Sequence, residues 1–293
     1  MPPRGDWPLL AAHPGTISWR RAGDARLLLA AGYALLLQVS HPVIGAGVSE
    51  HSSFRRDPWG RLARTLDYTY TMVYGGPQAA GEMGRRIRAM HGQIHGLGPD
   101  GRRYHALEAE PYAWVHATLA AAIVAAHERF ARPLAPEQRE CFWAEWRSVG
   151  RLLGIGEAQL PADWSAFGDY FKEMVENRLQ HTSAVDEVLE ALARPAPPAP
   201  LRGPAWTVAR IPLGHVLGLT SAGLLGPALR QRFAIRWTRA MDLELRALSA
   251  TLHATTPLMP SWLLNVGPGY LRLRTRRSPS GARRSEHHAD TFS

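Results

Sequence analysis

The chain has only one cysteine, Cys141, among its 293 residues. A single thiol forms no intrachain disulfide, and it cannot supply the several thiolates that cysteine-based zinc and iron–sulfur sites require. The sequence also lacks GxGxxG, GxxxxGK[ST] and GxSxG segments, which leaves dinucleotide, phosphate-loop and serine hydrolase sites without support. Any metal or cofactor must therefore depend on histidine, and the chain has 13 histidines.

Strand patterns are scarce as well. No segment shows a sustained alternation of apolar and polar residues, whereas apolar residues recur at intervals of three and four along much of the chain. The first 13 residues contain no apolar run followed by small residues, so we identify no secretion signal. Together with the lone cysteine, which fits a reducing compartment, these features predict a cytoplasmic, all-α protein.

Acidic residues are outnumbered, because 34 basic residues against 25 acidic ones give a formal charge of +9. Many of the arginines lie on amphipathic segments, and six gather near the C-terminus: Arg272, Arg274, Arg276, Arg277, Arg283 and Arg284. We interpret this as a solvated surface with a basic tail and expect no nucleic-acid partner. A nucleic-acid-binding helical protein remains an alternative, which a steep salt dependence of DNA binding would reveal.

Apolar periodicity predicts helices over residues 24–40, 59–74, 78–94, 111–130, 136–153, 163–178, 185–193, 208–229 and 233–252. The first of these is apolar almost all round, which indicates a buried helix. The prolines between residues 194 and 204 cannot lie inside a helix, so we interpret them as a surface crossing within one domain. We predict an N-terminal arm (1–20), a single large helical domain (21–270) and a basic, poorly ordered tail (271–293).

Residues 211–229 form a run in which only His215 is ionisable. The prolines and glycines of this run favour a broken helix pair buried in protein over a membrane span. Peripheral contact with a membrane stays open as an alternative.

Several histidines lie on or beside apolar faces: His41, His51, His91, His95, His116 and His127. In such a place an imidazole tends to be neutral, and a neutral imidazole nitrogen is a good iron ligand. His91 and His95 have the i, i+4 spacing of a zinc-binding helix, but no glutamate follows His91 and no third ligand is indicated. Zinc hydrolysis is therefore disfavoured.

A cluster of another kind comes from the segment 59–74. Arg61, Arg64 and Thr65 have i, i+3 and i+4 spacing, so they project from one side of the predicted helix. Two cations and a hydroxyl on one inward-leaning face suit a carboxylate, a propionate or a phosphate. A surface arginine pair with an incidental threonine fits the same spacing.

Nine short segments, taken in order, resemble one known family: 37–42 (LQVSHP), 50–54 (EHSSF), 57–65 (DPWGRLART), 91–96 (HGQIHG), 104–106 (YHA), 114–116 (WVH), 142–145 (FWAE), 153–155 (LGI) and 160–161 (LP). Their order and spacing are similar to the latex clearing protein (rubber oxygenase) and MpaB-type oxygenase family, a domain long catalogued as of unknown function. The resemblance covers roughly residues 20 to 270.

That resemblance implies a helical fold with a globin-like core and a b-type haem held by one proximal histidine. The position that best matches this iron ligand is His91, with His95 as the alternative, and the resemblance also implies that Arg61 and His51 contribute to cofactor binding. The haem iron then keeps one coordination position for dioxygen.

The resemblance also implies three catalytic residues, which are Arg64, Thr65 and Glu50. The family's Arg-x-x-Lys-Thr stretch is met by Arg61, Arg64 and Thr65, with arginine at the lysine position. Because a guanidinium stays protonated and is a poor iron ligand, Arg64 is expected to pair with a haem propionate or to orient dioxygen. The family's distal acidic residue maps most simply to Glu50.

The reaction that the resemblance implies is oxidative cleavage of a carbon–carbon double bond in an apolar substrate. Since we identify no export signal, a small isoprenoid or lipid fits better than extracellular rubber. A helical protein that binds haem or lipid without turnover is the alternative from another functional class.

Overall fold

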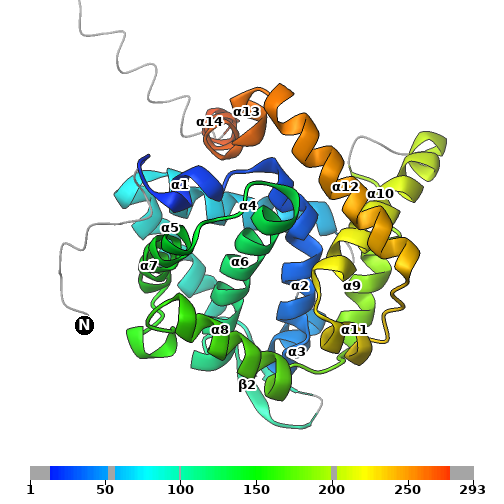
Figure 1. The fold of residues 1–293 in the computed structure, drawn as a ribbon. Coiled ribbons are helices and arrows are strands. Elements are labelled where there is room, and N and C mark those ends of the chain that lie inside the picture. Colours follow the sequence, from blue (N-terminus) through cyan, green and yellow to red (C-terminus); the bar gives the residue numbers. More distant parts are fainter. Residues whose placement is uncertain (1–13, 52–56, 99, 199–202, 278–293) are drawn as a thin grey trace, which may run out of the picture.

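The longest helix of the described residues, α6 (Ala109–Phe130), passes through the middle of the molecule (Figure 1). Its sequence alternates small alanines with large side chains, so neighbouring helices approach it closely on several sides. In the computed structural model, residues 14–51, 57–98, 100–198 and 203–277 are described. Most of the expected arm (1–20), the Ser52–Phe54 part of the quoted pattern and most of the expected tail (271–293) lie outside these residues.

The N-terminal half consists of α1 (Ile17–Arg21), a 3₁₀ helix η2 (Ala25–Ala30), α2 (Ala31–Val39), α3 (Pro42–His51), α4 (Pro58–Tyr74), α5 (Gly76–His91), the strands β1 (His95–Leu97) and β2 (Arg103–His105), and α6. The rest consists of α7 (Pro136–Leu152), η3 (Glu157–Gln159), α8 (Trp164–Glu173), a π turn η4 (Met174–Arg178), α9 (Ser183–Ala193), α10 (Pro204–Leu224), α11 (Pro227–Arg232), α12 (Arg239–Thr255), η5 (Thr256–Leu258), α13 (Ser261–Leu264) and α14 (Gly267–Arg277).

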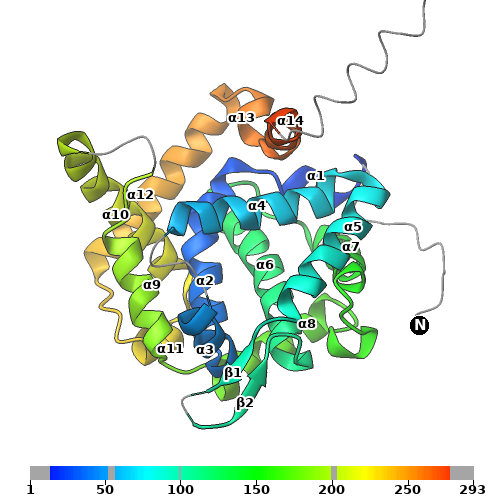
Figure 2. The same ribbon diagram turned by 180° about the vertical axis from the view of Figure 1, so that it is seen from behind.

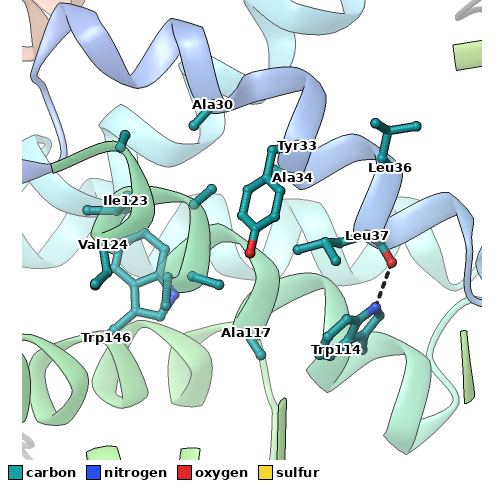
Figure 3. Close-up of a cluster of buried hydrophobic side chains, with 14 of the residues drawn as sticks. Ala30, Tyr33, Ala34, Leu36, Leu37, Trp114, Ala117, Ile123, Val124 and Trp146 are labelled. Carbon is teal, nitrogen blue, oxygen red and sulfur yellow. Dashed lines mark hydrogen bonds between the residues drawn. The ribbon is translucent and has the colours of Figure 1, made fainter. Parts of the chain in front are cut away.

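One large core joins most of these helices, and a small second cluster (Met72, Ala80 and Val149) joins α4, α5 and α7, so the described chain is a mostly helical single domain, as predicted. Figure 3 shows its centre, where Tyr33 and Leu37 of α2 meet Trp114 of α6. The Trp114 indole N–H donates to the Leu37 carbonyl at 2.8 Å. A buried indole therefore has its polar atom satisfied while its ring fills the core.

The segment 24–40 is helical as expected, but it is not one regular helix. Asp24 accepts from the Arg26 backbone N–H at 3.0 Å, and the 3₁₀ helix η2 gives way to α2 at Ala31. No helix was predicted between residues 40 and 59, but α3 starts at Pro42 and is bent 107° from the preceding helical segment. Proline disrupts a continuing helix but suits the first position of a new one.

The expected helix 78–94 ends three residues early. α5 stops at His91, with Gly92 as its C-cap, and His95 lies in β1, which pairs antiparallel with β2. Each strand has only three residues, so the hairpin is too short to produce a sustained alternation in the sequence. The i, i+4 spacing of His91 and His95 therefore does not place them on one helix face.

Two more boundaries differ from expectation at the C-terminal end. α10 continues through Pro212 and ends at Leu224, and the break in the run 211–229 comes before Pro227. The last described helix, α14, runs to Arg277, although residues from 271 onward were expected to be poorly ordered.

Among the described residues, no single helix is both long and apolar enough to cross a bilayer. The bent pair Ala25–Val39 and Pro42–His51 meets the length and composition requirement jointly. Six of the nine residues of α2 are buried inside the protein, which accounts for its apolar composition.

Candidate functional site

His91 is the last residue of α5, the helix that packs against α4. The ring is partly buried, and its Nδ1 lies 2.8 Å from the carbonyl oxygen of Ile87 one turn earlier. It meets the Tyr112 ring edge-on at a centroid distance of 5.6 Å, and the Tyr112 hydroxyl donates to the Leu153 carbonyl at 3.2 Å. The orientation of the imidazole is thus fixed by the backbone of its own helix and by a tethered aromatic ring.

The protonation of His91 follows from this environment. Burial lowers the pKa of the imidazole below its ordinary value, and the bond to the Ile87 carbonyl raises it in part. The ring is therefore neutral near pH 7, and because a carbonyl only accepts, the proton resides on Nδ1. This leaves a lone pair on Nε2, which makes no hydrogen bond to any residue that the structure describes.

His253 provides a comparison within the same chain. Its Nδ1 also faces the carbonyl four residues earlier, that of Ser249 at 2.7 Å, but its Nε2 lies 2.6 Å from the Ala131 carbonyl. Both of its nitrogens therefore contact protein. Metal-binding histidines characteristically donate one ring N–H to a backbone carbonyl and keep the other nitrogen for the metal, a pattern that His91 meets and His253 does not.

Two further histidines that were named from the sequence, His116 and His127, make hydrogen bonds inside the core. His116 is buried, and its Nε2 lies 2.9 Å from the Trp146 carbonyl while the Trp146 indole donates back to the His116 carbonyl at 3.1 Å. The Nε2 of His127 lies 3.1 Å from the Arg21 carbonyl. These contacts link helices to their neighbours, which is a structural role.

His95 and His51 lie on the outside of the hairpin. His95 is exposed and stacks on His105 at a ring distance of 6.3 Å. The His51 Nε2 lies 3.1 Å from the His95 carbonyl oxygen. Within the described parts of the chain, no group of three or more His, Cys, Asp or Glu side chains has the arrangement of a metal site, so a zinc centre on His91 and His95 gains no support.

The three polar residues of α4 differ in their surroundings. Arg61 is partly buried, and burial, followed by the nearby charge of Arg64, lowers its pKa from the ordinary value. Arg64 is exposed and pairs with Asp57 at 3.4 Å, while the exposed Thr65 donates to the Arg61 carbonyl at 3.0 Å. Arg61 alone among the three thus meets the expectation of an inward-leaning side chain.

α4 packs against α5, and one contact between the two helices lies next to His91. The two helices pack together along their lengths, and the Tyr68 hydroxyl lies 3.8 Å from the Met90 sulfur, next to His91. Asp57 caps α4 by accepting from the Gly60 N–H at 2.8 Å.

Glu50 belongs to a different part of the surface. Its carboxylate accepts from the Tyr104 hydroxyl at 2.6 Å and faces a cleft of about 1210 Å³ between α3, the hairpin and the start of α9. Burial and Glu50 raise the pKa of Tyr104 to about 12, so this phenol stays a donor. The residues that line this cleft include neither His91 nor Arg61.

Sequence reasoning missed the polar chain on the opposite wall of this cleft. The Nε2 of buried His41 lies 3.4 Å from one oxygen of Glu110, and Arg178 contacts the other at 3.2 Å. Burial lowers the pKa of His41. The His41-Pro42 pair was noticeable in the sequence, but Glu110 and Arg178 lie 69 and 137 residues away from His41, so no local spacing connects them.

Comparison with known proteins gives one family and two relatives. The family described as "ER-bound oxygenase mpaB/B'/Rubber oxygenase, catalytic domain" matches residues 19–254. An uncharacterized protein of Mycobacterium bovis and one of Mycobacterium tuberculosis are each 24% identical over 236 residues, which cover 78% of this chain and 89% of the relative. No solved structure matches the chain, so the globin-like core stays a prediction.

Proposed function

Because this chain belongs to the mpaB and rubber oxygenase catalytic-domain family, and is by that membership an oxygenase, we propose that it is a haem b-dependent enzyme acting on an apolar, isoprenoid-like or lipid-like substrate. The observation that carries the proposal is His91. It combines a neutral ring, an Nδ1 held by a backbone carbonyl and an Nε2 that makes no hydrogen bond within the described part of the chain.

The donor chemistry of this histidine fits a haem. A single neutral imidazole is the axial ligand of many b-type haem proteins, and a hydrogen bond from its other nitrogen to a carbonyl increases its basicity. A bound haem would supply the iron chemistry that activates dioxygen. His95 fits the ligand role less well, because it is exposed on a short strand and stacked on another histidine.

In this proposal α4 supplies the positive charge. Arg61 is the partly buried cation of the helix that packs along α5, which suits pairing with a haem propionate. Arg64 and Thr65 would then act at the more exposed edge, where they orient dioxygen or substrate. Glu50 would act from the cleft that it shares with Tyr104, and His51 from the end of α3, where its Nε2 meets the His95 carbonyl of the hairpin.

The substrate class that we propose rests on the family, whose description names a rubber oxygenase catalytic domain. Rubber is an isoprenoid hydrocarbon, so an apolar, isoprenoid-like or lipid-like chain is the corresponding class for this protein. Cleavage of a carbon–carbon double bond by dioxygen to give two carbonyl groups is the reaction that we propose. A substrate of this kind resides in membranes, which agrees with peripheral contact between the protein and a lipid surface.

A haemin titration tests the site directly. We expect one equivalent of haemin to produce a Soret band in the wild-type protein, and we expect His91→Gly to lose it and to regain it when imidazole is added. His253→Gly is the matched control, since His253 makes the same bond to its helix carbonyl but has no free Nε2. Imidazole rescue separates ligation from a merely structural role of His91.

Two results would contradict the proposal. If the wild-type protein is folded by circular dichroism but does not bind haemin, haem is not its cofactor. If the Soret band of His91→Gly is unchanged, His91 is not the iron ligand. Oxygen consumption with polyunsaturated isoprenoids separates the enzyme from a protein that binds haem without turnover.

A further inference from the structure

Four large apolar side chains stand exposed at one end of the molecule. They belong to η2, η5, α13 and α14: Leu28 is 42% exposed, Leu258 83%, Trp262 69% and Leu273 60%. We call this set the α13 corner. Soluble proteins scatter single exposed leucines widely, but several large apolar residues close together usually mark a surface that meets a partner.

The fold gathers these four residues from distant parts of the sequence. η5 leads into α13 within three residues, α14 starts three residues after α13 ends, and α13 packs on η2. Both ribbon views place α13 and α14 together on the same side of the molecule (Figures 1 and 2). The corner is therefore one region of the surface.

The corner is attached firmly to the rest of the domain. The Val266 N–H donates to the Gly23 carbonyl at 2.8 Å, and the Tyr270 hydroxyl donates to Asp67 of α4 at 2.7 Å. Arg274 binds the same carboxylate through Nε at 2.9 Å. Since the backbone around it is held in place, exposure of Trp262 is a property of the fold and not of a loose end.

The local sequence also divides into an inner and an outer side. Leu263 and Leu264 of α13 are partly buried, whereas Trp262 before them and Leu258 in the preceding turn face outward. Pro257 and Pro260 restrict the backbone between these outward residues. The short helix thus presents an indole and a leucine side chain on a rigid turn, with little conformational entropy to lose on contact.

Charge next to the corner indicates which partner it suits. The sequence of α14, GPGYLRLRTRR, contains four arginines and no acidic residue, and the whole chain carries +9. Two copies of the protein joined at this surface would bring two basic helices together, which costs electrostatic energy. An anionic lipid surface attracts such a helix and accepts leucine and tryptophan side chains at its interface.

We propose that the α13 corner is a docking surface for anionic phospholipid bilayers, with Leu258 and Trp262 entering the interface while the positive charge of the α14 segment attracts the headgroup phosphates. This surface is separate from the run 211–229. The proposal depends on neither haem nor oxygenase activity.

Sedimentation with vesicles tests this docking. We expect the full-length protein to bind vesicles made of equal parts phosphatidylcholine and phosphatidylglycerol, and to bind pure phosphatidylcholine much more weakly. Leu258→Ser combined with Trp262→Ala should weaken binding by about tenfold or more, because two large apolar side chains no longer enter the interface. Val208→Ser is the matched control, since Val208 is 71% exposed on α10, away from the corner.

Fluorescence identifies the residue that enters the lipid. Brominated phosphatidylglycerol should quench part of the tryptophan emission of the wild-type protein, and Trp262→Phe should lose that quenching while its binding is nearly preserved. Equal binding by the double variant and by Val208→Ser would overturn the proposal, as would absence of binding to anionic vesicles at low salt. The proposal would also be overturned if the wild-type protein is a dimer and the double variant is a monomer, because this surface would then bind a second copy of the chain.

Discussion

The buried imidazole of His116 makes stability depend on pH in a way that can be calculated. His116 lies between α6 and α7, stacked on Trp146 at a ring distance of 5.4 Å and bonded to its carbonyl. Burial lowers its pKa from 6.5 to about 4, and the bond to the Trp146 carbonyl offsets only part of this effect. The folded protein therefore keeps this ring neutral at a pH where the unfolded chain is already protonated.

The sign of the effect follows from proton binding in the two states. Between pH 6.5 and pH 4 the unfolded state binds a proton that the folded state does not, so acid favours unfolding. The stability is complete above pH 6.5 and is lost as the pH falls toward 4. At 1.36 kcal/mol per pH unit, lowering the pKa from 6.5 to about 4 corresponds to a total loss of about 3 kcal/mol.

Urea unfolding at a series of pH values measures this contribution. His116→Gln cannot titrate, so its stability relative to wild type should improve by about 1 kcal/mol between pH 6 and pH 5, whatever its stability at neutral pH. If His116→Gln and wild type lose stability in parallel as the pH falls, His116 is not neutral in the folded protein and the reasoning fails.

Two further substitutions test the fold and the separation of the two polar regions. Glu145→Ala should reduce the free energy of unfolding by about 2–4 kcal/mol, because the Ile17 and Ser18 N–H groups that donate to this buried carboxylate at 3.0 and 2.7 Å lose their acceptor; urea unfolding measures it, with exposed Glu137→Ala as the control. Tyr104→Phe should leave haemin affinity unchanged, because Tyr104 and Glu50 face the cleft and not His91; a large drop in affinity would mean that the cleft and His91 form one site.

The sequence predicted the helical fold well because its apolar spacing is strong. The helices around residues 59–74, 111–130 and 136–153 end within two residues of their expected bounds. In these segments the local sequence signals for the start and the end of a helix agreed with the apolar spacing. In α4, for example, Asp57 is the N-cap and Gly75 follows the last residue. Boundaries failed where a local signal was ambiguous, as at Pro42, since proline fits both the end of one helix and the start of the next.

The hairpin made the observed site differ from the predicted one more than any helix boundary did. Its strands span three residues each, and its pairing of His95 with His105 joins positions on either side of a turn. Nothing in the spacing of His91 and His95 distinguishes a continuing helix from a helix followed by a strand. Gly92, which becomes the C-cap of α5, was the one local signal for the stop.

The number of histidines did not indicate which of them could bind a metal. The hydrogen-bond partners of each ring nitrogen are a better indicator. His116, His127 and His253 use Nε2 to reach a backbone carbonyl of another helix or turn, so their rings connect parts of the core. His91 lacks such a contact although its Nδ1 is held like that of His253. His127 also has one ring nitrogen without a hydrogen bond, its Nδ1, but that atom is buried in the core, whereas the Nε2 of His91 is not fully buried and so can be reached by a ligand.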